Sequence, residues 1–328
     1  MKRLSLESIA TAALFFAVAL VPLFTGLAFA QEDAAGFPSR PISFISPLPA
    51  GTSSDLASRL IAKEAEKFLG KPVIMVNRPG GSTTIGAAAV AAAKPDGYTV
   101  GYIASSALFV MPFLGPLPYH PLKDFQQILQ FGETIFGASV RTDSRFKEFK
   151  EVIAFARQNP RKLNYGSSGT NSILNLTFEK IAKDNGVELF HIPYKGGVET
   201  TAALLGGQIE ISTGDVSASL VRSGQVRPIL LFTETHLSEY PGVPILKDIG
   251  YDIPFPGIIS IMAPRGLPDG IAKSLEEAFT KAMNEPGFFE GMKKLNFPVL
   301  HRSGKELSDY VIRNYEIYEK LVKEMARP

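Results

Sequence analysis

The segment of residues 42–70 reads ISFISPLPAGTSSDLASRLIAKEAEKFLG, and its pattern of hydrophobic residues changes in the middle. Its first four residues are mostly β-branched or aromatic and predict a strand. Over residues 55–69, apolar side chains recur at helical spacing and predict a helix. Thr52 and Asp55 fit a capping box at the helix start, and Gly70 is expected to end it. The segment therefore predicts a strand, a loop and a helix in succession.

The same alternation continues along the chain. Further strands are expected at residues 73–76, 98–104, 163–165, 187–192, 209–212 and 226–232. Further helices are expected at residues 146–158, 173–183, 198–205 and 305–324, and one capped by Ser82 or Thr83 is expected to run to Ala93. Strands that alternate with helices form βαβ units, so the sequence predicts an α/β fold with mostly parallel sheets.

The first thirty residues are typical of a secretory signal peptide. Two basic residues precede an apolar stretch, residues 9–24, and the A-x-A sequence of residues 28–30 follows it. An uncleaved membrane anchor is the weaker alternative, because Pro22 and Gly26 interrupt the apolar run. The chain has no cysteine that could carry a lipid anchor. We expect cleavage after Ala30 and a mature protein in the periplasm.

Length, charge and cysteine content exclude several classes of protein. The 298 residues that follow the leader, of 328 in all, suit two domains of roughly 150 residues each. A formal net charge of +2 on the whole chain argues against nucleic acid as a partner. The absence of cysteine removes thiol catalysis, thiolate metal sites and iron–sulfur clusters. The chemistry must therefore come from other side chains or from the backbone.

Three loops rich in glycine and serine each join an expected strand to an expected helix. They are residues 46–55, 77–83 and 166–172. The first backbone N–H groups of a helix lack intrahelical acceptors and lie at the positive end of its dipole. Such loops can bind an anion without lysine or arginine, and ligands of open α/β sheets lie at this edge of the sheet. Any single loop of this kind has ordinary helix capping as its simplest explanation, so the prediction rests on all three.

Known enzyme and cofactor motifs are not matched. The glycines at 80–86 do not spell G-x-G-x-x-G, and Gly70-Lys71 is followed by proline, which excludes a P-loop. No serine lies in G-x-S-x-G. The four histidines are far apart in sequence and none lies in H-E-x-x-H. We therefore expect no catalytic residues, no metal site and no cofactor.

With these loops, a series of short motifs resembles the Bug-type extracytoplasmic solute receptors, which are the substrate-binding subunits of tripartite tricarboxylate transporters. The resemblance covers essentially the whole mature chain. Its motifs appear in the family's order: FPSRPI at 37–42, PLPAG at 47–51 with Asp55, VNRPG at 76–80, PDGYT at 95–99, YGSSG at 165–169, PYKG at 193–196, LGGQIE at 205–210 and AP at 263–264.

The resemblance implies a two-lobed type II periplasmic binding protein fold, each lobe a mostly parallel sheet flanked by helices. Residues 31–137 and 258–328 would form lobe one and residues 138–257 lobe two, with the chain crossing near 135–138 and near 257–262. It implies a monomeric receptor that captures a small carboxylate between its lobes, catalyses no reaction and delivers the ligand to integral-membrane permease subunits.

The resemblance also assigns candidate ligand-binding residues. Asp55 is expected to cap the helix and orient the first loop rather than touch an anion. Tyr194 and Lys195 are candidates for lining the cleft, with a structural turn as the alternative. The full set is Ala50, Gly51, Thr52, Ser53, Ser54 and Asp55 in lobe one, and Ser167, Ser168, Gly169, Thr170, Tyr194 and Lys195 in lobe two.

The chain departs from the family's pattern at three places. Thr52 stands where a second glycine is common, Ile258 where an aromatic residue often follows Gly257, and residues 212–215 lack the phenylalanine–aspartate pair of amino-acid-binding members. The ligand therefore stays open among aliphatic dicarboxylates, aromatic carboxylates, and citrate-like and nicotinate-like acids. A sensory receptor for a carboxylate and an exported hydrolase are the alternative functions.

Overall fold

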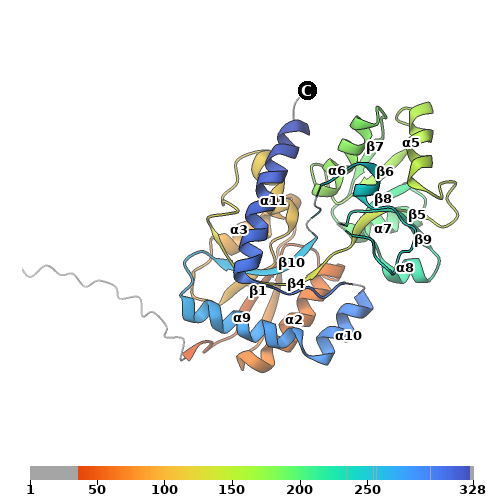
Figure 1. The fold of residues 1–328 in the computed structure, drawn as a ribbon. Helices are drawn as coiled ribbons and strands as arrows, with labels where there is room; N and C mark the ends of the chain where they lie inside the picture. The colour runs from red at the N-terminus through yellow and green to blue at the C-terminus, as the bar shows by residue number, and fades with distance from the viewer. Residues whose placement is uncertain (1–35, 234, 254, 256, 296, 326–328) are drawn as a thin grey trace, which may run out of the picture.

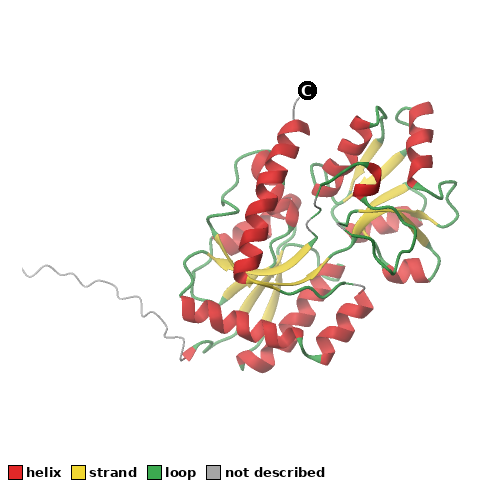
Figure 2. Cartoon of the chain, in the orientation of Figure 1, coloured by secondary structure: helices red, strands yellow, loops and turns green. Residues whose placement is uncertain are grey.

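The computed structural model describes residues 36–233, 235–253, 255, 257–295 and 297–325. The predicted signal peptide and its cleavage site lie outside these residues. None of the helices in the described ranges combines the length and the apolar character that a membrane span requires. Two separate sheets, each flanked by helices, make up two lobes (Figures 1 and 2).

The first lobe contains a six-stranded sheet with the order β11-β4-β10-β3-β1-β2. Its strands are β1 (Ile42–Ser46), β2 (Val73–Asn77), β3 (Thr99–Gly101), β4 (Phe125–Glu133), β10 (Ile258–Pro264) and β11 (Arg302–Ser303). Its main helices are α2 (Ser53–Leu69), α3 (Thr84–Ala91), α4 (Ser105–Phe109), α9 (Asp269–Met283), α10 (Pro286–Leu295) and α11 (Gly304–Met325). Buried Phe44, Ile61, Phe279 and Phe288 belong to one core that joins β1 to α2, α9 and α10.

The second lobe contains a five-stranded sheet with the order β7-β6-β8-β5-β9. Its strands are β5 (Phe136–Arg141), β6 (Asn164–Ser167), β7 (Phe190–Pro193), β8 (Ile211–Asp215) and β9 (Val226–Leu231). Its helices are α5 (Phe149–Gln158), α6 (Ile173–Asp184), α7 (Gly197–Leu205) and α8 (Ala218–Arg222). Buried Val140, Tyr165 and Phe178 pack between this sheet and its helices.

Both sheets are mixed, and the prediction of mostly parallel sheets is wrong in this respect. Strand β1 is parallel to β2 and β3, and β6 is parallel to β7 and β8, because a helical segment returns the chain in the same direction each time. Strand β4 leads out of the first lobe and β10 leads back into it, so these two strands are antiparallel. Strand β5 is likewise antiparallel to β8 and β9.

The two connections between the sheets run side by side. The first lies between the end of β4 and the start of β5, and the second ends at Gly257, just before β10. The backbone N–H of Thr134 donates to the carbonyl of Gly257 at 2.6 Å. A Cβ atom added to Gly257 would lie 2.2 Å from the carbonyl oxygen of Thr134, so only glycine fits there.

The predicted helices and strands are all present, and some of their ends differ. The strands β4, β5, β10 and β11 and the helices α4, α8, α9 and α10 were not predicted. Helix α5 begins at Phe149 instead of residue 146, because Glu148 and Glu151 form a capping box. The strand expected at 98–104 ends at Gly101, and α4 follows it. The strand expected at 187–192 is shifted to Phe190–Pro193. These shifts move the loops at the carboxyl ends of the strands by only a few residues.

Candidate ligand-binding cleft

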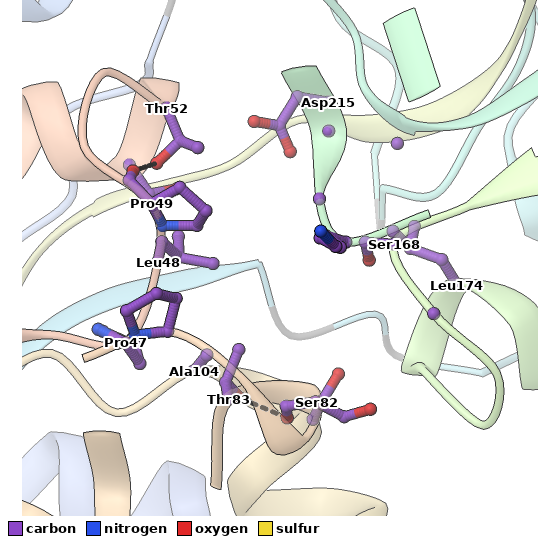
Figure 3. A pocket seen from close by; sticks show the side chains of 18 of the residues that line it. Pro47, Leu48, Pro49, Thr52, Ser82, Thr83, Ala104, Ser168, Leu174 and Asp215 are labelled. Carbon is purple, nitrogen blue, oxygen red and sulfur yellow. Dashed lines mark hydrogen bonds between the residues drawn. The ribbon is translucent and has the colours of Figure 1, made fainter. Parts of the chain in front are cut away.

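A cavity of about 650 Å³ lies between the two lobes. Its walls are the loops that follow β1, β2 and β3 in the first lobe and β6, β7 and β8 in the second. These loops meet because the carboxyl ends of parallel strands lie at the same edge of a sheet. Figure 3 shows Thr52 and Ser82 on one side of the cavity, facing Ser168 and Asp215 on the other.

The loop after β1 is held in place by Asp55, which is fully buried. Its carboxylate accepts hydrogen bonds from the backbone N–H of Gly51 (2.9 Å), from Arg59 Nε (2.8 Å) and from Asn77 Nδ2 (2.7 Å). Burial raises the pKa of Asp55, but the hydrogen bonds and the charge of Arg59 outweigh it and keep the pKa below its ordinary value. Asp55 therefore stays charged and fixes the loop from behind, outside the cavity lining.

The predicted capping box between Thr52 and Asp55 does not form. The Asp55 carboxylate accepts a hydrogen bond from the backbone N–H of Gly51 and not from that of Thr52. The Thr52 hydroxyl donates to the carbonyl of Pro49 at 3.0 Å (Figure 3). Helix α2 begins at Ser53. No described residue accepts a hydrogen bond from the backbone N–H of Ser53 or Ser54. The first turn of the helix thus brings two free donors to the cavity wall.

The loop after β2 contains a left-handed turn. Four consecutive residues have positive φ: Gly80 (117°), Gly81 (56°), Ser82 (49°) and Thr83 (76°). Serine and threonine adopt this conformation at a cost of roughly 1–3 kcal/mol each, and such strain is concentrated at functional sites. Ser82 and Thr83 line the cavity. The sequence indicated this loop as a possible anion site, but its residues were not among the predicted ligand-binding residues.

The loop after β6 supplies Ser168 and Gly169 to the cavity. Gly169 has φ = 124°, which favours glycine, and a Cβ atom at this residue would lie 3.7 Å from Ser82 Oγ of the opposite lobe. Ser167 lies behind the loop and is fully buried. Its hydroxyl donates to the carbonyl of Gly169 at 3.0 Å and lies 2.7 Å from His191 Nε2. Thr170 is exposed at the loop's outer end.

The Ser167–His191 pair corrects one expectation. The sequence offered no serine paired with a base, because 24 residues separate the two side chains. Parallel pairing of β6 with β7 brings them together, with His191 opposite Tyr165. Neither residue of the pair lines the cavity. The pair therefore supports the loop and does not face the space that a ligand would occupy.

Asp215 is a cavity residue that the sequence analysis did not assign. It ends β8, and its side chain points across the cavity toward Thr52 of the other lobe (Figure 3). Burial raises the pKa of Asp215 to about 6. Buried Tyr102 from the first lobe also lines the cavity, and burial and the nearby Asp215 both raise its pKa. The expected strand stopped at residue 212, three residues before Asp215, whereas β8 extends to Asp215.

The predicted residues divide into two groups. Those that line the cavity are Thr52, Ser53, Ser54, Ser168, Gly169, Tyr194 and Lys195. Those outside its lining are Ala50, Gly51, Asp55, Ser167 and Thr170. Lys195 and Asp215 are the only charged side chains of the described lining, so the walls are formally neutral. The described residues contain no group of three or more histidines and acidic residues that could hold a metal ion.

Comparisons with known proteins extend over nearly the whole chain. A family model described as tripartite tricarboxylate transporter family receptor matches residues 57–326. The chain is 34% identical over 299 residues to the UPF0065 protein in the gbd 5' region of Cupriavidus necator, covering 90% of this chain and 91% of that protein.

Three solved structures share the fold. A periplasmic transporter is similar at 29% identity with a TM-score of 0.82 and covers 88% of this chain and 98% of its own. The periplasmic binding protein BugD matches at 25% identity with a TM-score of 0.78, over 88% and 98% of the two chains. A protein of R. palustris, solved with adipate, matches at 25% identity with a TM-score of 0.77, over 88% and 97%. The predicted two-lobed α/β fold is confirmed.

Proposed function

Because this chain belongs to the receptor family of tripartite tricarboxylate transporters, as its sequence motifs indicated, we propose that it captures a small carboxylate between its lobes. The family is one of periplasmic solute-binding receptors. For this chain we propose export, with cleavage after Ala30, and action as a monomer. The proposed division is residues 31–137 with 258–328 as lobe one and residues 138–257 as lobe two, although the first strand of the second sheet, β5, already begins at Phe136.

The observation that carries the proposal is the presence of free backbone donors on both sides of one cavity. Ser53 and Ser54 offer N–H groups from the first turn of α2, and no described residue accepts from the N–H of Ser168 or Gly169 in the opposite loop. Fixed backbone amide donors can recognise the two oxygens of a carboxylate without an arginine. Similarity to the adipate-containing R. palustris protein supports the same ligand class.

We propose hinge closure as the mechanism of capture. The ligand would first occupy the donors of lobe one, and lobe two would then rotate about the paired connections at Thr134 and Gly257. The ligand shifts the equilibrium only by binding the closed form more tightly than the open one. The closed form would then deliver the carboxylate to integral-membrane permease subunits. Presentation to a signalling protein is the second candidate, since it needs the same cleft.

We propose that the protein catalyses no reaction. The serine and histidine that lie closest to a nucleophile–base geometry, Ser167 and His191, are both outside the cavity lining. Ser167 is fully buried, so no ester or amide could reach its hydroxyl without rearrangement of the loop. Turnover of a carboxylic ester or amide by the purified protein would contradict this part of the proposal.

A thermal-shift screen of the purified mature protein against mono- and dicarboxylates tests the ligand class. A carboxylate present at about 100 times its dissociation constant should add roughly 2.7 kcal/mol to the free energy of unfolding. A response to sugars, cations or nucleotides alone would refute the carboxylate assignment. A pull-down with membrane extracts, with and without the ligand that binds, separates delivery to a permease from presentation to a signalling protein.

A further inference from the structure

Behind the second ligand loop lies a group of polar side chains that do not touch the cavity. Tyr165 and Ser167 lie on the same face of β6, since successive side chains of a strand alternate. His191 pairs with Tyr165 across the parallel β6–β7 ladder. Its ring lies 4.8 Å from the Tyr165 ring, centroid to centroid, and its Nε2 lies 2.7 Å from Ser167 Oγ. The imidazole is therefore fixed by a ring contact and a hydrogen bond.

We infer the direction of this contact from the number of protons available. The Ser167 hydroxyl has one proton, and it donates that proton to the carbonyl of Gly169 at 3.0 Å. The hydroxyl can then only accept from His191, so Nε2 carries a hydrogen. A histidine that activates a serine nucleophile has the opposite arrangement, with its nitrogen accepting the hydroxyl proton. His191 thus acts on Ser167 as a donor and not as a base.

The hydrogen bond from Ser167 to the carbonyl of Gly169 orients the backbone of the loop. The carbonyl of Gly169 accepts from Ser167 Oγ and from the N–H of Ser172 at 3.3 Å, so it points back into the lobe. In a planar trans peptide the next N–H, that of Thr170, points the opposite way. No described residue accepts a hydrogen bond from the N–H of Ser168, Gly169 or Thr170. Thr170 lies outside the cavity lining, so the unused donors of this loop that belong to the cavity wall are those of Ser168 and Gly169.

The far end of the loop is tied to the same tyrosine. The side chain of Asn175 accepts from the N–H of Asn171 at 2.9 Å and donates to the hydroxyl of Tyr165 at 2.7 Å. That hydroxyl donates in turn to Glu179. Tyr165 thus connects both ends of the loop, through His191 at one end and through Asn175 at the other. Side chains of the second lobe therefore hold the loop at both ends.

We propose that His191 is a positioning residue for ligand binding: its Nε2–H holds Ser167, and Ser167 holds the carbonyl of Gly169, so that the loop offers its N–H groups to the ligand. The inference rests on the proposed capture of a carboxylate. It predicts that affinity depends on a side chain that never touches the ligand. A preorganised loop binds more tightly because less freedom is lost on binding.

Titration calorimetry with the carboxylate that gives the largest thermal shift tests the proposal. The variants His191→Leu and Ser167→Ala should each weaken binding about five- to tenfold, the range that one neutral hydrogen bond supplies. The double variant should bind no more weakly than the weaker single variant, because both changes break one chain of contacts. His191→Gln keeps an N–H donor and should restore most of the affinity.

The control is His236→Leu, at a largely exposed histidine whose side chain is 63% accessible. It should leave affinity unchanged. Hydrogen exchange should speed up at residues 168–170 in His191→Leu and Ser167→Ala and not in the control. If His191→Leu does not fold, Ser167→Ala and His191→Gln decide the question alone.

Three results would overturn the inference, and they can be told apart. If the wild-type protein binds no carboxylate, the proposed function fails and the inference fails with it. If the wild type binds and Ser167→Ala binds equally well, the positioning role alone is wrong. Independent, multiplying losses in the double variant would also contradict a single chain from His191 to Gly169.

Discussion

Asp215 and Thr52 face each other across the cavity from opposite lobes (Figure 3). Thr52 belongs to the loop in which α2 begins with free N–H groups, which favours an anion. Asp215 is itself an acid, and burial raises its pKa to about 6. The cleft therefore combines a donor-rich wall with a carboxyl group whose charge changes near neutral pH. This relationship gives the first prediction.

Carboxylate affinity should rise as the pH falls through about 6, because protonation of Asp215 removes a negative charge that faces the ligand. Asp215→Asn should bind the ligand more tightly above that pH, by about 1 kcal/mol or roughly fivefold for charges about 4 Å apart in water. It should also lose the pH dependence. Calorimetry from about pH 5.5 to 8 measures both effects. Weaker binding by Asp215→Asn would mean that the side-chain carboxylate of Asp215 accepts a hydrogen bond from the ligand.

The same residue should affect stability with a definite sign. The folded pKa of Asp215 is raised from 3.8 to about 6, so the folded state binds the proton more tightly than the unfolded chain. The stability that Asp215 contributes to the folded state is fully present below pH 3.8 and is lost as the pH rises through about 6. Asp215→Asn should therefore be more stable than the wild type above pH 6 and not below 3.8. Urea unfolding at several pH values tests this; an unchanged difference across the range would contradict it.

Asp55 should show the opposite dependence. Its folded pKa lies below the ordinary 3.8, so it stabilises the fold above pH 3.8, and this contribution is lost as the pH falls through the lower folded value. Asp55→Asn should lose about 1–3 kcal/mol at neutral pH, because a buried charged acceptor of three hydrogen bonds is replaced. Ligand affinity should fall as well, since the first loop loses its anchor. Asp143→Asn is the matched control, because that carboxylate is exposed, is paired with an arginine as Asp55 is, and lies outside the cleft lining.

Gly257→Ala should destabilise the protein. The added Cβ atom would lie 2.2 Å from the carbonyl oxygen of Thr134, at the place where the two lobe connections are hydrogen bonded. Overpacking of this kind typically costs about 1–3 kcal/mol, measured by urea unfolding. Gly115→Ala is the control, because no atom lies within 4 Å of the added Cβ. Equal free energies of unfolding for Gly257→Ala and Gly115→Ala would show that the two lobe connections can move apart at Thr134 and Gly257 without loss of stability.

Ser82→Gly should make the folded protein more stable and its carboxylate binding weaker. It removes a left-handed serine (φ = 49°) and should raise the free energy of unfolding by up to about 1 kcal/mol. It should also weaken carboxylate binding, because the hydroxyl lines the cavity and the turn becomes less rigid. Arg161→Gly relieves the same kind of strain (φ = 60°) outside the cavity lining. It should raise the free energy of unfolding and leave carboxylate binding unchanged. Tighter binding by Ser82→Gly would contradict a role for the strained turn.

The helices and strands that the sequence did predict are present because hydrophobic periodicity and helix capping are local, but β4, β5, β10, α9 and α10 were missed. Helices α6 and α7 begin within one residue of their predicted starts. The capping box at Thr52 was predicted wrongly, because Asp55 finds a better set of donors that includes Asn77 from β2. The sheets were predicted as mostly parallel because local pattern does not reveal that β4 and β10 connect two lobes.

The loops that offer free N–H groups could be predicted from the sequence, because the residues that start a helix and leave its first donors unused are neighbours in the chain. Three contacts could not be predicted in this way: Ser82 approaches Gly169, Asp215 faces Thr52, and His191 contacts Ser167. These pairs come from different strands, and their distances depend on strand order and lobe packing. A local pattern contains no information about such order, because each strand could pair with several others at similar free energy.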